Sequence, residues 1–169
     1  MTYFEIFNIP VQLRVDTAAL SRRFFELSRQ YHPDYFATAT PAEQETALER
    51  SALLNKAWKT FQQPDETIKY VLAQKGLLAE EEKYDLSPLF LAEVMELNEA
   101  LMDADEPGVQ AALQQRIEQL QQESYAPVRD IIENYNDESA TTDHLLQVKE
   151  YYYRKKYLER IRRQLAGMV

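Results

Sequence analysis

The sequence of 169 residues contains no cysteine, only two histidines and only three glycines. Without cysteine the chain has no disulfide bonds, no thiol nucleophile and no thiolate ligands for a metal. His32 and His144 cannot build a metal site by themselves, so a bound metal would need a cage made only of carboxylates. The glycines are too few for a phosphate-binding loop, and no Gly-x-Ser-x-Gly or His-Glu-x-x-His pattern occurs. We therefore expect a protein that is not an enzyme, with no catalytic residues, no metal and no cofactor.

Positive charge and long apolar runs are also scarce. The 19 Lys and Arg residues are outnumbered by 28 Asp and Glu residues, and the formal net charge is −9. A nucleic-acid partner requires a basic face, so we expect none. No apolar run approaches the roughly 20 residues that a bilayer span requires, and the residues after Met1 lack the features of a signal peptide. These absences predict a cytoplasmic protein with no membrane partner.

The charges are distributed unevenly along the chain. Residues 1–75 contain nine basic and nine acidic residues, whereas residues 76–148 contain three basic and seventeen acidic ones. Residues 149–163 reverse the sign, with seven basic and two acidic residues. The simplest interpretation is that these are solvated helix faces and that the last helix complements the charge of the one before it.

Apolar residues recur at spacings of three and four almost throughout, and β-branched alternation is scarce, which predicts an all-α fold. Asp16, Thr40 and Ser87 are predicted N-caps, and Pro127 predicts a kink or break inside the sixth helix. The three long helices at the end of the chain are expected to pack as an antiparallel bundle. The predicted helices cover approximately residues 3–7, 17–32, 41–64, 66–75, 88–104, 107–134 and 142–167.

A polar segment between the fourth and fifth helices is the predicted domain junction. It runs from Gly76 to Ser87, contains three consecutive glutamates and is followed by Pro88 in the first turn of a helix. The chain is thereby divided into an N-terminal domain of residues 1–75, a linker of residues 76–87 and a C-terminal three-helix domain of residues 88–169.

The end of the second helix contains the most specific motif, Tyr31-His32-Pro33-Asp34. Proline disfavours the helical conformation in the residue before it, so the chain must leave the helix there at a fixed angle. The imidazole and the carboxylate are then presented as a pair on a rigid platform. An isolated motif of this kind would be only a helix stop with two solvent-facing neighbours. Here a short aromatic helix comes first, and the motif ends the long helix that follows it. After a short loop comes a partner helix that contains Asn55-Lys56-Ala57-Trp58.

This arrangement resembles the J-domain, the module through which co-chaperones stimulate the ATPase of DnaK-type heat-shock chaperones. The resemblance implies that His32, Pro33 and Asp34 dock on the chaperone, with Asp34 engaging a chaperone cation. It also implies that the exposed face of the second helix binds an acidic chaperone surface. The candidates on that face are Arg22, Arg23 and Arg29. Their alternative role is a ladder of ion pairs with Glu26 within the helix.

The resemblance extends to essentially the whole chain, which is similar to J-domain co-chaperones of the HscB type. It rests on the opening Thr2-Tyr3-Phe4-Glu5-Ile6-Phe7, on the tripeptide followed by Tyr35-Phe36, and on one acidic three-helix domain. HscB-type proteins serve iron–sulfur cluster assembly, in which they bind an IscU-like scaffold protein and deliver it to the chaperone HscA.

The fold implied by the resemblance is all-α and L-shaped. An N-terminal J-domain, made of a helical hairpin with the His-Pro-Asp loop and short helices, would be joined to a C-terminal three-helix bundle that binds the scaffold. One departure from the family pattern is Tyr35, which stands where J-domains usually have lysine.

The fifth predicted helix has two apolar rows. The first row is Phe90, Val94, Leu97 and Leu101, and the second is Leu91, Met95 and Met102. Carboxylates, among them Glu96 and Glu99, lie beyond the second row. An apolar strip of this width, edged by acidic residues, suits a protein partner. The alternative is a central bundle helix that buries both rows against two neighbouring helices.

The resemblance assigns a scaffold-binding patch on this helix. The implied patch consists of Leu91, Ala92, Met95, Glu96 and Glu99, with Tyr153 from the last helix. In this patch Ala92 replaces a larger apolar residue, and Tyr153 replaces phenylalanine.

Two other functions remain open at this point. The tripeptide does not specify a client, so a J-domain co-chaperone for a different client protein is the first alternative. The second is a helical-bundle enzyme with two carboxylate-bridged metals, but such bundles use Glu-x-x-His pairs and the sequence contains none. We expect the protein to be a monomer.

Overall fold

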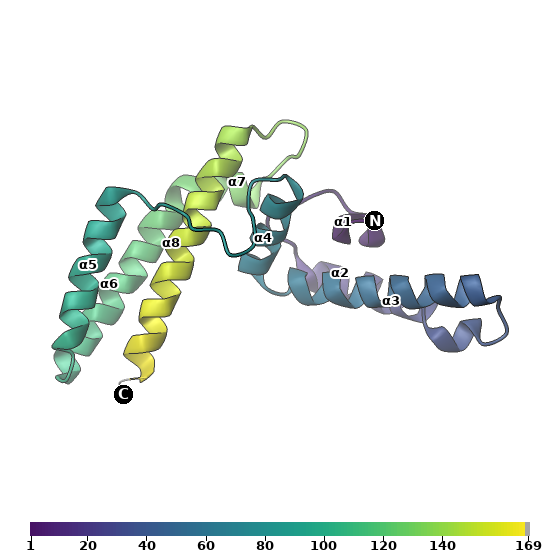
Figure 1. The fold of residues 1–169 in the computed structure, drawn as a ribbon, viewed down its shortest axis with the longest axis horizontal. Helices are drawn as coiled ribbons and strands as arrows, with labels where there is room; N and C mark the ends of the chain where they lie inside the picture. The colour runs from purple at the N-terminus through teal and green to yellow at the C-terminus, as the bar shows by residue number, and fades with distance from the viewer. Residues whose placement is uncertain (168–169) are drawn as a thin grey trace. The chain divides into compact units, whose positions relative to one another are not determined.

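The computed structural model describes residues 1–167, and within that range every regular element is helical (Figure 1). The chain divides into two compact units. One comprises Met1–Gln74 together with Tyr135–Ser139, and the other comprises the remaining described residues. The all-α prediction is confirmed. None of the helices in this range is long and apolar enough to cross a membrane.

The first unit is built around a helical hairpin. Helices α2 and α3 pack against each other, and the short 3-10 helix η1 lies in the loop that joins them and contacts α3 (Figure 1). Helices α1 and α4 also pack against α3. The bounds are α1 (Tyr3–Phe7), α2 (Thr17–Gln30), η1 (Pro33–Phe36), α3 (Pro41–Phe61) and α4 (Pro64–Gln74).

Side-chain caps set the beginnings of three of these helices. Thr2 and Thr40 each form a reciprocal capping box with the glutamate three residues later, and Asp16 accepts a hydrogen bond from the Ala19 N–H. Each cap satisfies amide groups that would otherwise lack a partner, and such caps contribute about 1 kcal/mol to helix stability. The predicted starts at Asp16 and Thr40 are therefore confirmed.

The core of this unit consists of apolar side chains from all four helices and the loop after α1. The large side chains with almost no exposed surface include Phe7, Leu13, Leu27, Leu54, Val71 and Leu72. Along α2, Leu20 and Leu27 are buried. Phe24 is half-buried and stacks on Trp58 of α3, with ring centroids 4.6 Å apart and an interplanar angle of 11°. This ring pair stabilises the packing of α2 against α3.

The second unit is a bundle of three long helices, α5, α6 and α8, which contact one another pairwise (Figure 1). Helix α6 stops at Tyr125 and the chain resumes helical structure as α7 after a 3-10 turn that contains Pro127, so the predicted break is confirmed. The bounds are α5 (Pro88–Met102), α6 (Pro107–Tyr125), η2 (Ala126–Val128), α7 (Arg129–Glu133) and α8 (Thr142–Gly167).

The bundle core draws on all three long helices. Phe90, Val94, Leu97 and Leu101 of α5 are buried with Ile117 of α6 and with Leu158 and Ile161 of α8. Fully burying one such side chain contributes roughly 1.5 to 3 kcal/mol.

The segment before α5, predicted as a linker of residues 76–87, packs on the bundle. Leu86 belongs to the bundle core, Tyr84 packs against that core, and Glu82 bonds to two residues of α8. The last two residues of the predicted range 88–169 lie outside the described residues.

Candidate functional site

His32 lies between α2 and η1 in the first unit. Helix α2 ends at Gln30, two residues before the predicted end, because Tyr31 leaves the helical conformation as the C-cap. Pro33 and Asp34 then form the first turn of η1, which the sequence had not predicted, and His32 is its N-cap. All three residues of the tripeptide are exposed. The loop thus has a defined backbone shape and exposed side chains.

The imidazole of His32 is oriented by its neighbour. Its Nδ1 accepts a hydrogen bond from the Asp34 N–H at 3.2 Å. An accepting Nδ1 places the proton of the neutral ring on Nε2, which faces away from this bond. The Asp34 carboxylate lies 3.5 Å from Nδ1, and its side chain is 89% exposed. The pair therefore offers a partner one ring donor and one carboxylate.

Gln44 of α3 fastens the loop, a role that sequence reasoning missed. Its amide Nε2 donates to the carbonyl oxygens of Phe36, Ala37 and Ala39 at 2.9, 3.3 and 3.4 Å. These carbonyls belong to the end of η1 and the residues after it. Glutamine lies one position after the capping box of α3, and no periodicity marks it as a loop contact.

The predicted basic face of α2 is exposed, and its cations differ in their pairing. Arg22 and Arg23 both reach Glu26, at 3.4 and 3.8 Å. Arg29 is exposed and has no ion pair among residues 1–167. Exposed pairs of this kind contribute at most about 1 kcal/mol, so the ladder leaves the three cations accessible to a partner.

Two large apolar side chains near this face also point into solvent. Phe25 of α2 is 62% exposed and Tyr35 of η1 is 72% exposed. Tyr35 lies edge-on to the His32 ring, with centroids 6.5 Å apart. In the sequence Tyr35 is notable only as a replacement for lysine, and no motif marks Phe25 as a surface residue.

On α5 the two apolar rows have different environments. The first row is buried in the bundle, whereas Leu91, Met95 and Met102 of the second row are 39%, 62% and 82% exposed. Ala92, Glu96 and Glu99 are exposed beside them. The alternative in which α5 buries both rows is therefore wrong. Five of the six predicted patch residues share one open surface of this helix.

Tyr153 of α8 has a more constrained position. It is half-buried, and its hydroxyl donates to Glu82 Oε2 at 2.9 Å while its ring stacks on Tyr84 at a centroid distance of 4.5 Å. It lines the same groove as Leu91. Burial and the hydrogen bond to Glu82 raise the pKa of Tyr153 above its usual range, so the ring stays neutral. Hydrogen bonds from Lys149 and Tyr153 lower the pKa of Glu82.

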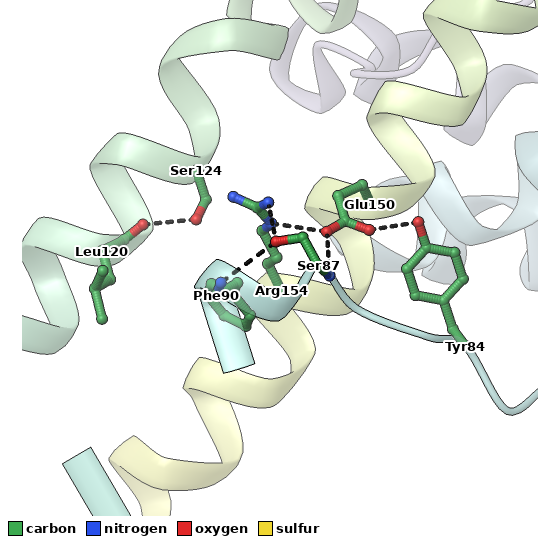
Figure 2. A network of polar contacts seen from close by, with 7 residues as sticks. All are labelled: Tyr84, Ser87, Phe90, Leu120, Ser124, Glu150 and Arg154. Atoms are coloured by element: carbon green, nitrogen blue, oxygen red, sulfur yellow. Dashed lines mark hydrogen bonds and ion pairs between the residues drawn. The ribbon is translucent and has the colours of Figure 1, made fainter. Parts of the chain in front are cut away.

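A polar network fixes the start of α5 against α8 (Figure 2). Glu150 Oε1 accepts from the Ser87 N–H at 3.2 Å and from Arg154 Nε at 3.0 Å, and Arg154 Nη2 donates to Ser87 Oγ at 3.0 Å. The Tyr84 hydroxyl donates to Glu150 Oε2. Since Ser87 is also the N-cap of α5, the network sets which residues of that helix face outward.

The C-terminal unit matches a known family. Residues 86–166 match the family model described as the HSCB C-terminal oligomerisation domain. The crystal structure of human co-chaperone protein HscB resembles the chain with a TM-score of 0.75 and 28% sequence identity, over 98% of this chain and 81% of the human chain. Chaperone HscB from Vibrio cholerae gives a TM-score of 0.76 and 26% identity, over 98% of this chain and 96% of that chain.

The chain as a whole is similar to the HscB co-chaperones, and its C-terminal unit matches their family model. This similarity supports an HscB-type co-chaperone of iron–sulfur cluster assembly whose J-domain contains the tripeptide loop. The assignment of individual site residues stays a prediction, as do the named partners and the monomeric state.

Proposed function

We propose that this chain binds an IscU-like iron–sulfur scaffold protein and stimulates the ATPase of an HscA/DnaK-type chaperone. The scaffold would bind the patch on α5, and the chaperone would bind His32, Pro33 and Asp34 together with the arginines of α2. Each task lies in one unit of the chain, so each is open to a separate mutational test.

The observation that supports scaffold binding most strongly is the exposed apolar row of α5. Met95 and Met102 are more than half exposed, although the same helix supplies four buried residues to the bundle core. Burying apolar surface of this kind against a partner contributes about 25 cal/mol of favourable free energy per Å² removed from water. Methionine side chains adapt to irregular partners, and the flanking carboxylates fit the polar rim of an interface.

The chaperone contact is supported by the construction of the loop. The fixed imidazole and the Asp34 carboxylate form one rigid polar anchor, because Pro33, the η1 turn and the Gln44 bonds restrict the backbone. A preformed anchor loses little conformational entropy on binding. The exposed cations of α2 would add attraction for an acidic surface and speed association.

The test of scaffold binding is the double substitution Leu91→Ala with Met95→Ala, with Leu48→Ala as a matched control. Leu48 is an exposed leucine of α3 in the other unit, so it controls for the loss of apolar surface. Interface anchors commonly contribute about 2 kcal/mol or more. We expect the affinity for purified IscU-like scaffold, measured by calorimetry, to fall at least severalfold in the double variant alone.

The same preparations should keep their melting temperature and their stimulation of the chaperone in the absence of scaffold. Exposed side chains change the free energy of unfolding by roughly 0.5 kcal/mol or less. A lowered melting temperature with unimpaired scaffold binding would refute the patch. A wild-type chain that stimulates the chaperone but does not bind the scaffold would indicate a different client.

A further inference from the structure

Helix α8 has a row of three cations that have no ion pair among the described residues. Lys156, Arg160 and Arg163 follow one another at spacings of four and three, which places them on one side of the helix, and all three are exposed. Of the three, Arg160 has its guanidinium over the Tyr157 ring, 5.5 Å from the centroid. The other basic side chains of α8 have polar partners within the chain. Lys149 bonds to Glu82 at 2.9 Å, Arg154 to Glu150 at 3.0 Å and Arg162 to Glu159 at 2.8 Å, and Lys155 also has an interaction.

These three cations line a groove of about 510 Å³ on the bundle. The groove lies among α8, the segment before α5 and the first turns of α5. Its apolar and aromatic lining consists of Tyr84, Leu86, Leu91, Tyr153 and Tyr157. Two carboxylates also line it, but Glu82 already accepts from Lys149 and Tyr153, which leaves Asp85 as the uncommitted one.

The groove therefore has an excess of positive charge in a chain whose formal net charge is −9. At physiological salt, charges more than roughly 8 Å away are largely screened, so the net negative charge of the rest of the chain has little effect at the groove. The local row of cations can therefore attract a short acidic segment. A long polyanion such as nucleic acid would also meet the many carboxylates of the same chain. Tyr153 is already stacked on Tyr84, so its ring is not free to stack on a base.

The groove is continuous with the patch on α5. Leu91 and Tyr153 belong to both, so a protein seated on the patch reaches the groove without leaving the bundle. We propose, on the basis of the function proposed above, that the groove receives an acidic segment of the same scaffold protein. The carboxylates of that segment would pair with Lys156, Arg160 and Arg163, and an apolar side chain of it would contact Leu91 and Tyr157.

The geometry defines the spacing of the acidic residues in the segment. Lys156 and Arg160 are four residues apart, which is about 6 Å along the helix axis. In an extended chain, residues i and i+2 lie on one face and are about 6.6 Å apart. An extended segment with acidic residues at alternate positions therefore fits Lys156 and Arg160, with its intervening side chains turned away from them.

The test compares scaffold affinity across salt concentrations for three full-length variants. The groove variant is Lys156→Glu with Arg160→Glu, and the patch variant is Leu91→Ala with Met95→Ala. The charge control is Lys56→Glu with Lys59→Glu, which changes the net charge equally at exposed positions of α3 in the other unit. Circular dichroism and melting temperature confirm that each variant is folded.

We expect the groove variant to lose about tenfold in scaffold affinity at low salt and most of the salt dependence of binding, as charge contacts across an interface do. The patch variant should lose affinity at every salt concentration and retain the salt dependence. The charge control should bind like the wild type.

Three results would overturn the proposal. They differ in whether the function proposed above also fails. If the groove variant and the charge control bind the scaffold alike, the groove is not part of the interface, while the proposed function stands. If the groove variant binds the scaffold normally but self-associates less in sedimentation, the groove receives a second copy of the chain. If the wild-type chain does not bind the scaffold at all, the proposed function fails together with the groove.

Discussion

His32 and His144 have the same local hydrogen bond but different surroundings. The Nδ1 of His144 accepts from the Thr141 N–H at 3.2 Å near the start of α8, just as the Nδ1 of His32 accepts from Asp34 in the loop. His144 follows the exposed Asp143, whereas His32 is followed by Pro33 and has the Asp34 carboxylate 3.5 Å from its Nδ1. His144 therefore serves as a control for His32, because both imidazoles accept a backbone N–H at the start of a helix.

We expect His32→Gln to abolish chaperone stimulation while His144→Gln leaves it unchanged. The longer and flexible glutamine side chain does not hold an acceptor at the place of Nδ1 and a donor at the place of Nε2 in the fixed geometry of the imidazole ring. Because His32 is exposed, the free energy of unfolding should change by roughly 0.5 kcal/mol or less. A steady-state ATPase assay and thermal unfolding on the same samples measure both effects. Stimulation retained by His32→Gln would contradict the role given to the loop.

At the scale of elements, the position of α5 depends on polar bonds from α8. Arg154 Nη2 bonds to the N-cap Ser87, its Nε bonds to Glu150, and its guanidinium lies 5.0 Å from the centre of the Phe90 ring. The Arg154 and Glu150 side chains are only 29% and 23% exposed. The pair is therefore less screened by water than the surface pairs of α2.

We expect Arg154→Met to lower the free energy of unfolding by about 1 to 3 kcal/mol, because partly buried acceptors lose their donor while the apolar contact with Phe90 is kept. The matched control is Arg162→Met, which removes the Glu159 pair from a side chain that is 55% exposed and should cost less than about 1 kcal/mol. Urea denaturation measures both values. Equal effects in the two variants would show that the network does not hold α5.

At the scale of the whole molecule, Tyr84, Tyr153 and Glu82 are among the groups of the second unit that make stability depend on pH. Burial and the Glu150 hydrogen bond raise the pKa of Tyr84 from 10.0 to about 12, and Tyr153 shifts in the same direction. A raised pKa means that the folded state retains its proton longer than the unfolded state, so this stabilisation is complete below pH 10 and is lost as the pH rises. For Glu82 the lowered pKa has the opposite sign, so its stabilisation is present above pH 4.5 and is lost on acidification.

We therefore expect the melting temperature to decrease between pH 10 and pH 12 and also below pH 4.5. The change Tyr84→Phe should flatten the alkaline decrease. Calorimetric scans across the pH range measure both limbs. An alkaline decrease that is unaltered by Tyr84→Phe would show that this hydroxyl is not its source.

The sequence alone predicted much of the secondary structure, because the signals for it are local. Asp16, Thr40 and Ser87 cap helices where they were predicted to, and Pro127 breaks the sixth helix. A cap or a proline acts within one turn of its own position, so its effect can be inferred without the rest of the chain. The tripeptide is equally local, and its position at the end of α2 was evident from the spacing of its neighbours.

Only the tertiary structure decided which surfaces are open. Periodicity places Leu91 and Met95 on one side of α5, but whether a neighbouring helix covers that side depends on how α6 and α8 pack, and the structure leaves it exposed. The same holds for Gln44, for the packing of residues 76–87 and for the three cations of the groove, whose significance depends on which anions lie within reach. A helical repeat fixes neighbours along the chain, whereas burial and pairing depend on residues brought together from distant parts of it.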